Sequence, residues 1–298
     1  MSEPTPLGGV LAVDKPAGWT SHDVVGRVRR LAGLRQVGHA GTLDPMATGV
    51  LVLCLGRATR LLEYLSGQPK TYLAEVTLGA ATDTYDAEGE VTARQPAPLL
   101  THEQLDAALD AFRGPIMQRP PAYSALKRDG VALYQRARAG EQVEVEPRPV
   151  TVYELALLAF DGQTVQLRIH CGAGTYVRSI AHDLGQALGC GGHLSALRRT
   201  AVGPFSIEDA ATLEQLAEPD ALVAALLPAE AAVAHLARVD VTEAEAVRLL
   251  HGQAIPGAAA QPVGPVCAYG PDQRFLGIIT FDPQRQAWRP QKMLAEPH

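Results

Sequence analysis

The residues with the clearest chemical potential lie in one glycine-rich loop. It runs from Gly38 to Gly49 and reads GHAGTLDPMATG. Glycines and a proline argue against a helix here, and Pro45 favours an extended backbone at Asp44. A bent loop of this kind is a common way to present a reactive side chain, and a carboxylate can serve as a nucleophile. The alternative is that Asp44 only accepts turn hydrogen bonds, as the Asp-Pro pair often does.

Basic side chains surround this loop in the sequence. Residues 1–70 contain eight basic and five acidic residues, whereas residues 201–240 contain one basic and seven acidic residues. That acidic stretch accounts for the whole net charge of −6. Phosphate binding depends on a local basic face, so the overall charge does not exclude an anionic substrate. Besides Lys15, the basic residues of the first quarter are Arg27, Arg29, Arg30, Arg35, Arg57, Arg60 and Lys70.

Several elements must position the loop. Residues 50–55 are continuously apolar and predict a buried strand directly after it. Residues 9–15 predict another strand, which ends in a Pro/Gly turn before Ser21, the expected N-cap of a helix to about Leu31. Residues 70–78 alternate as a half-buried strand does, with Tyr72 on the apolar face. A tyrosine at such a position is usually part of the core.

The remaining elements follow from similar patterns. Tyr176 and Arg178 would share one side of the chain if their segment is extended. The acidic turn at residues 82–89 lacks the spacing of a calcium-binding EF-hand loop. Helices are expected at residues 58–65, 101–112, 131–139, 180–188, 207–236 and 241–250, and strands at 150–160, 164–169, 266–269, 275–281 and 287–294.

The bulk composition is that of a folded protein. The chain has 298 residues, of which 47% are apolar and 19% are charged. We expect no secretory signal and no membrane span, because the longest apolar runs are far shorter than the ~20 residues that a span needs. Four scattered cysteines without a CxxC pair predict reduced thiols, a cytoplasmic protein and no metal site.

At this point the motifs identify a family. The Asp44 loop closely resembles the catalytic motif of the TruB family, the tRNA pseudouridine-55 synthases. Residues 9–21 look like the first motif of that family, and the C-terminal residues resemble its PUA-like RNA-binding module. The later motifs match in order at Lys70-Thr71-Tyr72, at residues 82–89, at residues 174–178 and at Leu197-Arg198-Arg199.

The resemblance implies roles for individual residues. Asp44 would be the catalytic aspartate, and Arg178 its ion-pair partner, which would lower the pKa of Asp44. Tyr72 would stack on the flipped base, and Tyr176 and Leu197 would line the base pocket. A further residue, His39, would fill the gap that the uridine leaves in the T loop. Whether Asp44 attacks the sugar, attacks the base or abstracts a proton at C2′ stays open.

The implied protein is an isomerase that needs no cofactor. We expect an α+β pseudouridine synthase fold with a mixed, mostly antiparallel central sheet, comprising a catalytic domain at residues 1–237 and a small PUA-like β domain at residues 238–298. Its partner would be the T-arm stem-loop of tRNA, bound by a monomer. One alternative is a tRNA-folding chaperone without chemistry. An aspartate-dependent phosphohydrolase is disfavoured, because Met46 stands where a second carboxylate would hold magnesium.

Overall fold

The computed structural model describes residues 8–123, 127–128, 131–132, 145–257 and 262–296. In this part of the chain, ten strands form one large mixed sheet. The main path of the sheet, in spatial order, is β14 (Ala211–Thr212), β1 (Gly9–Lys15), β3 (Thr48–Leu55), β12 (Gly192–Val202), β4 (Lys70–Leu78), β11 (Thr164–Cys171), β10 (Arg148–Phe160) and β7 (Gly114–Gln118). Two short strands extend it, since β2 (Val37–His39) pairs with β3 and β13 (Phe205–Ser206) pairs with β12.

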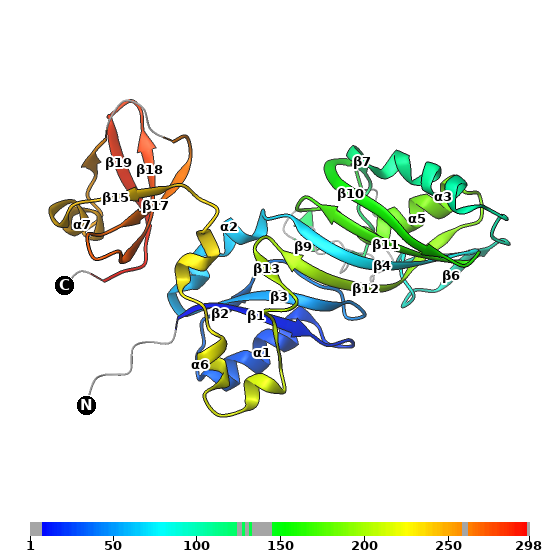
Figure 1. The fold of residues 1–298 in the computed structure, drawn as a ribbon, viewed down its shortest axis with the longest axis horizontal. Helices are drawn as coiled ribbons and strands as arrows, with labels where there is room; N and C mark the ends of the chain where they lie inside the picture. Colours follow the sequence, from blue (N-terminus) through cyan, green and yellow to red (C-terminus); the bar gives the residue numbers. More distant parts are fainter. Residues whose placement is uncertain (1–7, 124–126, 129–130, 133–144, 258–261, 297–298) are drawn as a thin grey trace.

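The pairing is mostly antiparallel, which confirms the predicted fold class. Only β1–β14 and β3–β12 run parallel among the described pairs of this sheet. A second sheet, drawn in brown to red, lies at one end of the molecule (Figure 1). It contains β15 (Arg238–Asp240), β17 (Pro265–Tyr269), β18 (Phe275–Asp282), β19 (Ala287–Met293) and β16 (Ile255–Pro256). Two small hairpins pair β5 (Ala80–Thr82) with β6 (Val91–Arg94), and β8 (Lys127–Arg128) with β9 (Val131–Ala132).

Helices cover the main sheet at both ends (Figure 1). Apolar side chains of α1 and of β1–β3 form one core, whereas α3 and α5 pack on a second core with β4, β10 and β11. In the described part of the chain, no helix is long and apolar enough to cross a bilayer. The α-helices are α1 (Ser21–Ala32), α2 (Leu62–Ser66), α3 (His102–Leu109), α5 (Val177–Ala187), α6 (Ala221–Ala225) and α7 (Glu243–Leu250), and the 3₁₀ helices are η1 (Gly56–Leu61), η2 (Asp110–Phe112), η3 (Gln215–Ala217) and η4 (Ala229–Val233).

Two helix predictions were wrong. Residues 207–236 were expected to be helical, but they form only the short pieces β14, η3, α6 and η4. The helix expected from Val131 does not begin there, because Val131 and Ala132 form β9, and residues 133–139 lie outside the described part. Ser21 is also not the N-cap of α1, because the hydroxyl of Thr20 takes that place in a capping box with Asp23.

The second sheet is fastened to the main body through its last strand. Arg57 donates to the carbonyl of Leu294 at 2.8 Å, and Arg60 donates to that of Met293 at 2.6 Å. In return, Lys292 donates to the carbonyl of Arg60 at 2.9 Å. Leu294 is buried in a core shared with η1, so the contact is apolar as well as polar.

Candidate active site

Residues 40–47 of the Asp44 loop connect β2 to β3, and they are held by the start of α1. The Ser21 hydroxyl accepts from the amide of Leu43 at 2.9 Å and donates to its carbonyl at 3.1 Å. The carbonyl of Pro45 accepts from the amide of Gly18 at 2.8 Å and from Nζ of Lys15 at 3.2 Å. The residues on either side of Asp44 are therefore fixed to the segment that joins β1 to α1.

Strand β12 holds the loop from the other side. The Arg199 side chain is 1% exposed and donates to the carbonyls of Val50 at 2.7 Å, Gly41 at 3.1 Å and Thr42 at 3.4 Å. At Gly49 the backbone φ is +101°, and a Cβ there would lie 2.1 Å from the carbonyl oxygen of Arg199. Only glycine permits this close approach of β3 to β12.

Arg178 joins two carboxylates. Its Nε lies 3.0 Å from Oδ2 of Asp44, and its Nη1 lies 3.1 Å from Oδ2 of Asp86. The side chains of Arg178 and Asp86 are 7% and 5% exposed, whereas that of Asp44 keeps 37% exposure. The carbonyls of Thr84 and Tyr123 also accept from this guanidinium, at 3.2 Å and 2.9 Å. Asp44 thus combines a fixed cation on one side with access on the other.

Burial raises the pKa of Asp44 above its ordinary value. The expectation that Arg178 lowers this pKa was right about the direction of that one influence, but desolvation is the larger cause. Asp86 adds to the increase, while Arg178 and Lys15 oppose it. Because the Asp44 oxygens contact Arg178 directly, the ion pair favours the charged form that nucleophilic or electrostatic catalysis requires.

A hollow of about 260 Å³ opens beside the Asp44 carboxylate. Tyr72 and Leu197 form part of its wall and are 8% and 9% exposed. Burial raises the pKa of the Tyr72 phenol, so this ring stays neutral and can offer a flat face to a base. Tyr176 and Arg178 complete the group of predicted residues that line the hollow with Asp44.

His39 lies on β2, outside the lining of this hollow. Its Nδ1 is buried and has no hydrogen-bond partner among the described residues. Burial lowers the pKa of His39, which favours the uncharged ring. The ring of His22 lies edge-on at a centroid distance of 6.0 Å.

Two buried lysines, Lys15 and Lys70, flank the loop, and neither was predicted from the sequence to be a site residue. Burial lowers the pKa values of Lys15 and Lys70 to about 8. Lys15 is 0% exposed and donates to the carbonyls of Pro16, Trp19 and Pro45. No periodicity reveals such a role, because the acceptors are backbone groups brought together by the fold.

The acidic turn at residues 82–89 also contributes to the site. Oδ1 of Asp86 accepts from the hydroxyl of Thr84 at 2.6 Å and from the amide of Glu88 at 3.1 Å, while Oδ2 of the same carboxylate contacts Arg178. Asp86 was not predicted to be a site residue, and the only sequence signal for it was that residues 82–89 match a motif of the family. The helix expected from Ile180 begins earlier, at Val177, so Arg178 lies in the first turn of α5 with Tyr176 as the N-cap, and the condition of an extended segment is not met.

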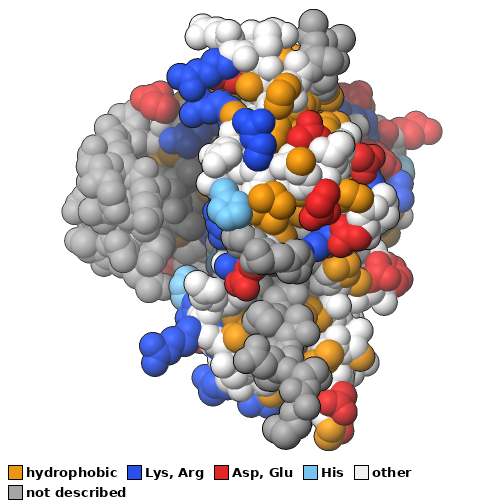
Figure 2. All heavy atoms as spheres, turned by 90° about the vertical axis from the view of Figure 1, so that its left-hand side faces the viewer, with side chains coloured by type: hydrophobic (Ala, Val, Ile, Leu, Met, Phe, Trp, Pro, Cys, Tyr) orange, Lys and Arg blue, Asp and Glu red, His pale blue; other side chains and the backbone are white. Residues whose placement is uncertain are grey.

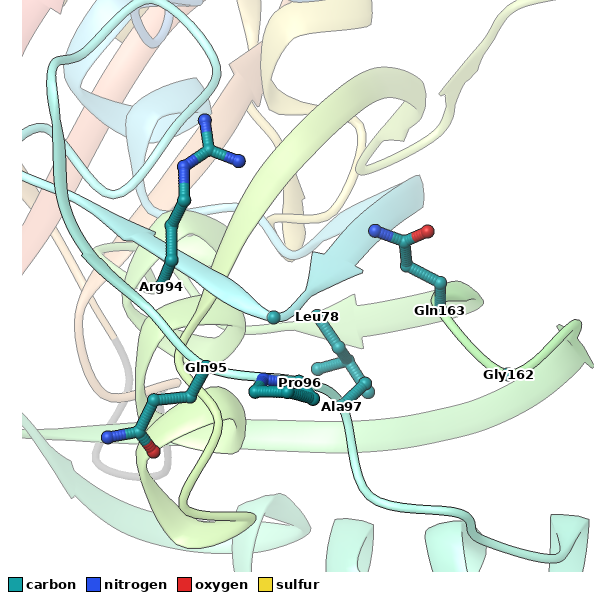
Figure 3. A pocket seen from close by; sticks show the side chains of 8 residues that line it. Leu78, Arg94, Gln95, Pro96, Ala97, Gly162 and Gln163 are labelled. Carbon is teal, nitrogen blue, oxygen red and sulfur yellow. The ribbon is translucent and has the colours of Figure 1, made fainter.

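A larger hollow, of about 510 Å³, lies at the opposite end of β4 (Figure 3). It is lined by Leu78, by residues 94–97 and by the turn between β10 and β11. Arg94 is the ionisable side chain of this lining. A lone guanidinium offers neither a nucleophile nor a base at neutral pH, so the smaller hollow at Asp44 is the candidate active site.

Comparisons with known proteins agree with this choice. Residues 29–177 match the N-terminal domain of the TruB family of pseudouridylate synthases, and residues 178–234 match the tRNA pseudouridylate synthase B C-terminal domain. The chain is 51% identical to the tRNA pseudouridine synthase B of Thermobifida fusca over 91% of this chain and 93% of that protein. It is 50% identical to the protein of the same name from Solibacter usitatus, over 85% and 87%.

Solved structures show the same fold. A crystal structure of a Cbf5-Nop10-Gar1 complex matches with a TM-score of 0.76 and 29% identity, covering 97% of this chain and 85% of the matched chain. An H/ACA ribonucleoprotein bound to a substrate RNA containing 2′-deoxyuridine matches with a TM-score of 0.74 and 27% identity, over 97% and 86%.

Proposed function

Since the chain belongs to the TruB family of pseudouridylate synthases, we propose that it converts uridine 55 in the T loop of tRNA to pseudouridine. The coarser statement follows from the family: the chain is an isomerase that acts on uridine in tRNA. The proposal adds the position in the RNA and the aspartate that carries the chemistry.

The observation that carries the proposal is the Asp44 carboxylate, ion-paired to Arg178 at the wall of a hollow. The reaction breaks the bond from N1 of the base to C1′ and forms a bond from C5 to C1′. During this exchange C5 loses its proton and N1 gains one. A charged carboxylate can attack covalently, stabilise positive charge at the sugar or accept a proton from C2′. Each of these routes requires an ionised Asp44.

The other site residues support a flipped nucleotide. A uridine inside a folded loop has to leave its stack before a carboxylate in a cleft can reach it. Tyr72 stacks on the base, while Tyr176 and Leu197 bound its pocket. His39 occupies the gap left in the RNA, a role that needs a flat ring and no proton, and burial favours its uncharged form.

The charge distribution suits an RNA partner. In the view onto the end that carries the second sheet, Lys and Arg side chains gather mainly on the left and acidic ones on the right (Figure 2). Such a basic side holds phosphates and gives an affinity that falls with salt. We assign residues 1–237 to catalysis and residues 238–298 to a PUA-like module that extends the footprint along the T arm. The protein acts as a cytoplasmic monomer.

The test is the substitution Asp44→Asn, assayed on a T-arm stem-loop with uridine tritiated at C5. Formation of pseudouridine releases this tritium to water. We expect Asp44→Asn to abolish release while affinity for the RNA stays within a few-fold. Asp209→Asn, at an exposed carboxylate that accepts from Ser206, is the matched control and should keep full activity.

Two results would contradict the proposal. Tritium release by Asp44→Asn at the wild-type rate would exclude the aspartate mechanism. A wild-type chain that binds the stem-loop but makes no pseudouridine at position 55 would favour the RNA-folding chaperone for this substrate.

A further inference from the structure

A third hollow lies beside the Asp44 loop, at the start of α1. Its volume is about 350 Å³, and we call it the Trp19 hollow. Trp19 is 37% exposed, whereas Trp288, the other tryptophan of the chain, is 3% exposed. The lining consists of Gly18, Trp19, His22, Asp23, Gly26 and Arg30. Exposed aromatic rings beside basic groups are the means by which proteins hold unpaired bases, because every base has a flat face.

Hydrogen bonds to backbone carbonyls connect the Trp19 hollow to the Asp44 loop. Nζ of Lys15 donates to the carbonyl of Trp19 at 2.6 Å and to that of Pro45 at 3.2 Å. The amide of Gly18 donates to the same Pro45 carbonyl at 2.8 Å. Pro45 follows Asp44 directly, so a single buried ammonium fixes the backbone of Trp19 relative to the reacting carboxylate. A ligand that spans both places would meet two rigidly related sites.

The charges of the hollow suit a nucleotide. Arg30 is exposed and belongs to the lining of the hollow, and its guanidinium would lie 3.9 Å from a Cβ placed on Gly26. Asp23 carries the opposite charge, but its Oδ2 already accepts from the amide and the hydroxyl of Thr20, at 2.9 Å and 2.6 Å. An arginine next to an aromatic face can bind a phosphate while the ring stacks on the base.

We propose that the Trp19 hollow holds a second nucleotide of the RNA, adjacent in sequence to the uridine that enters the Asp44 site. Its base stacks on Trp19 and its phosphate contacts Arg30. The inference rests on the proposed function and deepens it by adding a subsite. Removing one nucleotide from a stack exposes its neighbour to water, and the Trp19 ring offers that neighbour a new apolar surface.

The experiment uses the Asp44→Asn chain, which prevents turnover, and measures RNA affinity together with tryptophan fluorescence. We expect the intact stem-loop to quench the fluorescence of Trp19 in the Asp44→Asn chain. This quenching should be absent when the same chain also carries Trp19→Phe. Trp19→Ala should weaken RNA binding about 5- to 10-fold. This is the lower part of the range of affinity lost when an aromatic ring that stacks on a base is removed, because one face of the Trp19 ring stays in water. Trp19→Phe should retain most of the affinity, since it keeps a ring.

A set of stem-loops with one abasic residue each then identifies the nucleotide. Abasic substitution at one position next to the target uridine should reproduce the loss seen with Trp19→Ala and add nothing to it, because both changes remove the same contact. Gly26→Leu should weaken binding as well, since it fills the hollow while leaving Trp19 in place. The control is Leu99→Ala, at a fully exposed apolar residue outside both hollows.

The outcomes separate the subsite from the reaction. Unchanged Trp19 fluorescence with every RNA, or equal affinities for Trp19→Ala and Leu99→Ala, would overturn the inference. Pseudouridine formation by the wild-type chain is measured in parallel on the intact RNA. If that formation persists when the fluorescence test fails, the Trp19 subsite is wrong and the proposed function stands. Suppose instead that Trp19→Ala and the abasic RNA lose the same affinity without adding to each other, while the wild-type chain makes no pseudouridine. The Trp19 subsite would then stand and the proposed function would be wrong.

Discussion

Asp86→Asn tests how Arg178 and Asp86 influence the Asp44 carboxylate that we propose to be catalytic. Asp86 lies in a turn, 3.1 Å from Arg178, and its other oxygen accepts from Thr84 and Glu88. Asparagine keeps the shape of the side chain but brings an NH₂ group, which must face either the guanidinium or the amide of Glu88. The substitution therefore removes one charge and forces a donor against a donor.

The magnitude follows from the bonds that change. A hydrogen bond to a charged group contributes about 1.5–3 kcal/mol, and a neutral one about 0.5–1.5 kcal/mol. Losing the Asp86 charge should therefore weaken the interaction between residue 86 and the Arg178 guanidinium by about 1–2 kcal/mol. If all of this appears in the transition state, the maximal rate falls about 5- to 30-fold. Asp44 still contacts the guanidinium, so the loss stays below that expected for Asp44→Asn.

The pH dependence gives a more specific signature. Burial raises the pKa of Asp44, and the negative charge of Asp86 raises it further. Because the proposed reaction needs ionised Asp44, we expect the wild-type rate to decrease as the pH falls through this raised pKa. Asp86→Asn removes one cause of the increase, so the acid limb of the profile should move to lower pH even though the plateau is lower. Single-turnover tritium release across the acidic range measures both effects.

A shift of the acid limb to higher pH, or no shift, would refute this reasoning. The matched control is Asp83→Asn in the same turn. Its carboxylate accepts from the amide of Glu90 at 2.8 Å, and Asp83 is not among the causes that shift the pKa of Asp44. This control should leave the acid limb where it is in the wild type.

Three further substitutions test the surroundings of the loop. Gly49→Ala should destabilise the fold by about 2–4 kcal/mol in urea unfolding, because its Cβ would overlap a β12 carbonyl at a positive φ, whereas Gly67→Ala, with open space around it, should be nearly neutral. Lys15→Met should cost about 1–3 kcal/mol, since it leaves buried carbonyls without donors, and should lower the rate more than the RNA affinity. Asp44→Asn should raise the melting temperature at neutral pH. The pKa of the Asp44 carboxyl is raised on folding, so its ionised form destabilises the folded state at neutral pH, and asparagine removes this cost. The difference in melting temperature should vanish below the ordinary pKa of aspartate, where Asp44 is protonated in both states.

Local patterns predicted the strands that frame the site. The apolar run before Leu55 and the alternation from Lys70 to Leu78 have simple periods, and both strands form where expected. The order of the motifs also led to the fold class and the family. These features are local, so a single sequence is enough to recognise them.

Long-range contacts explain what the patterns missed. Ser21 was expected to cap α1, but its hydroxyl binds Leu43 and leaves the cap to Thr20. Tyr176 can begin α5 without a side-chain cap because the amide side chain of Gln118 bonds both its amide and its carbonyl. None of these partners is close in sequence.

The segment at residues 207–236 failed for a different reason. Its composition favours helix, but Pro219 and Pro228 divide it. Leu227 then exchanges two backbone hydrogen bonds with Val10, at 2.9 Å and 2.8 Å. Contact with the edge of the main sheet outweighs helix propensity here.

The attachment of β19 to η1 has a consequence for synthesis. Arg57 and Arg60 leave the ribosome more than two hundred residues before the carbonyls of Leu294 and Met293 that they bind. Until then, the apolar surface around η1 lacks its C-terminal cover, in a period when nascent chains are prone to aggregate. A premature stop before Met293 would thus leave a polypeptide that contains every proposed site residue yet carries a permanently uncovered patch for chaperones and proteases to recognise.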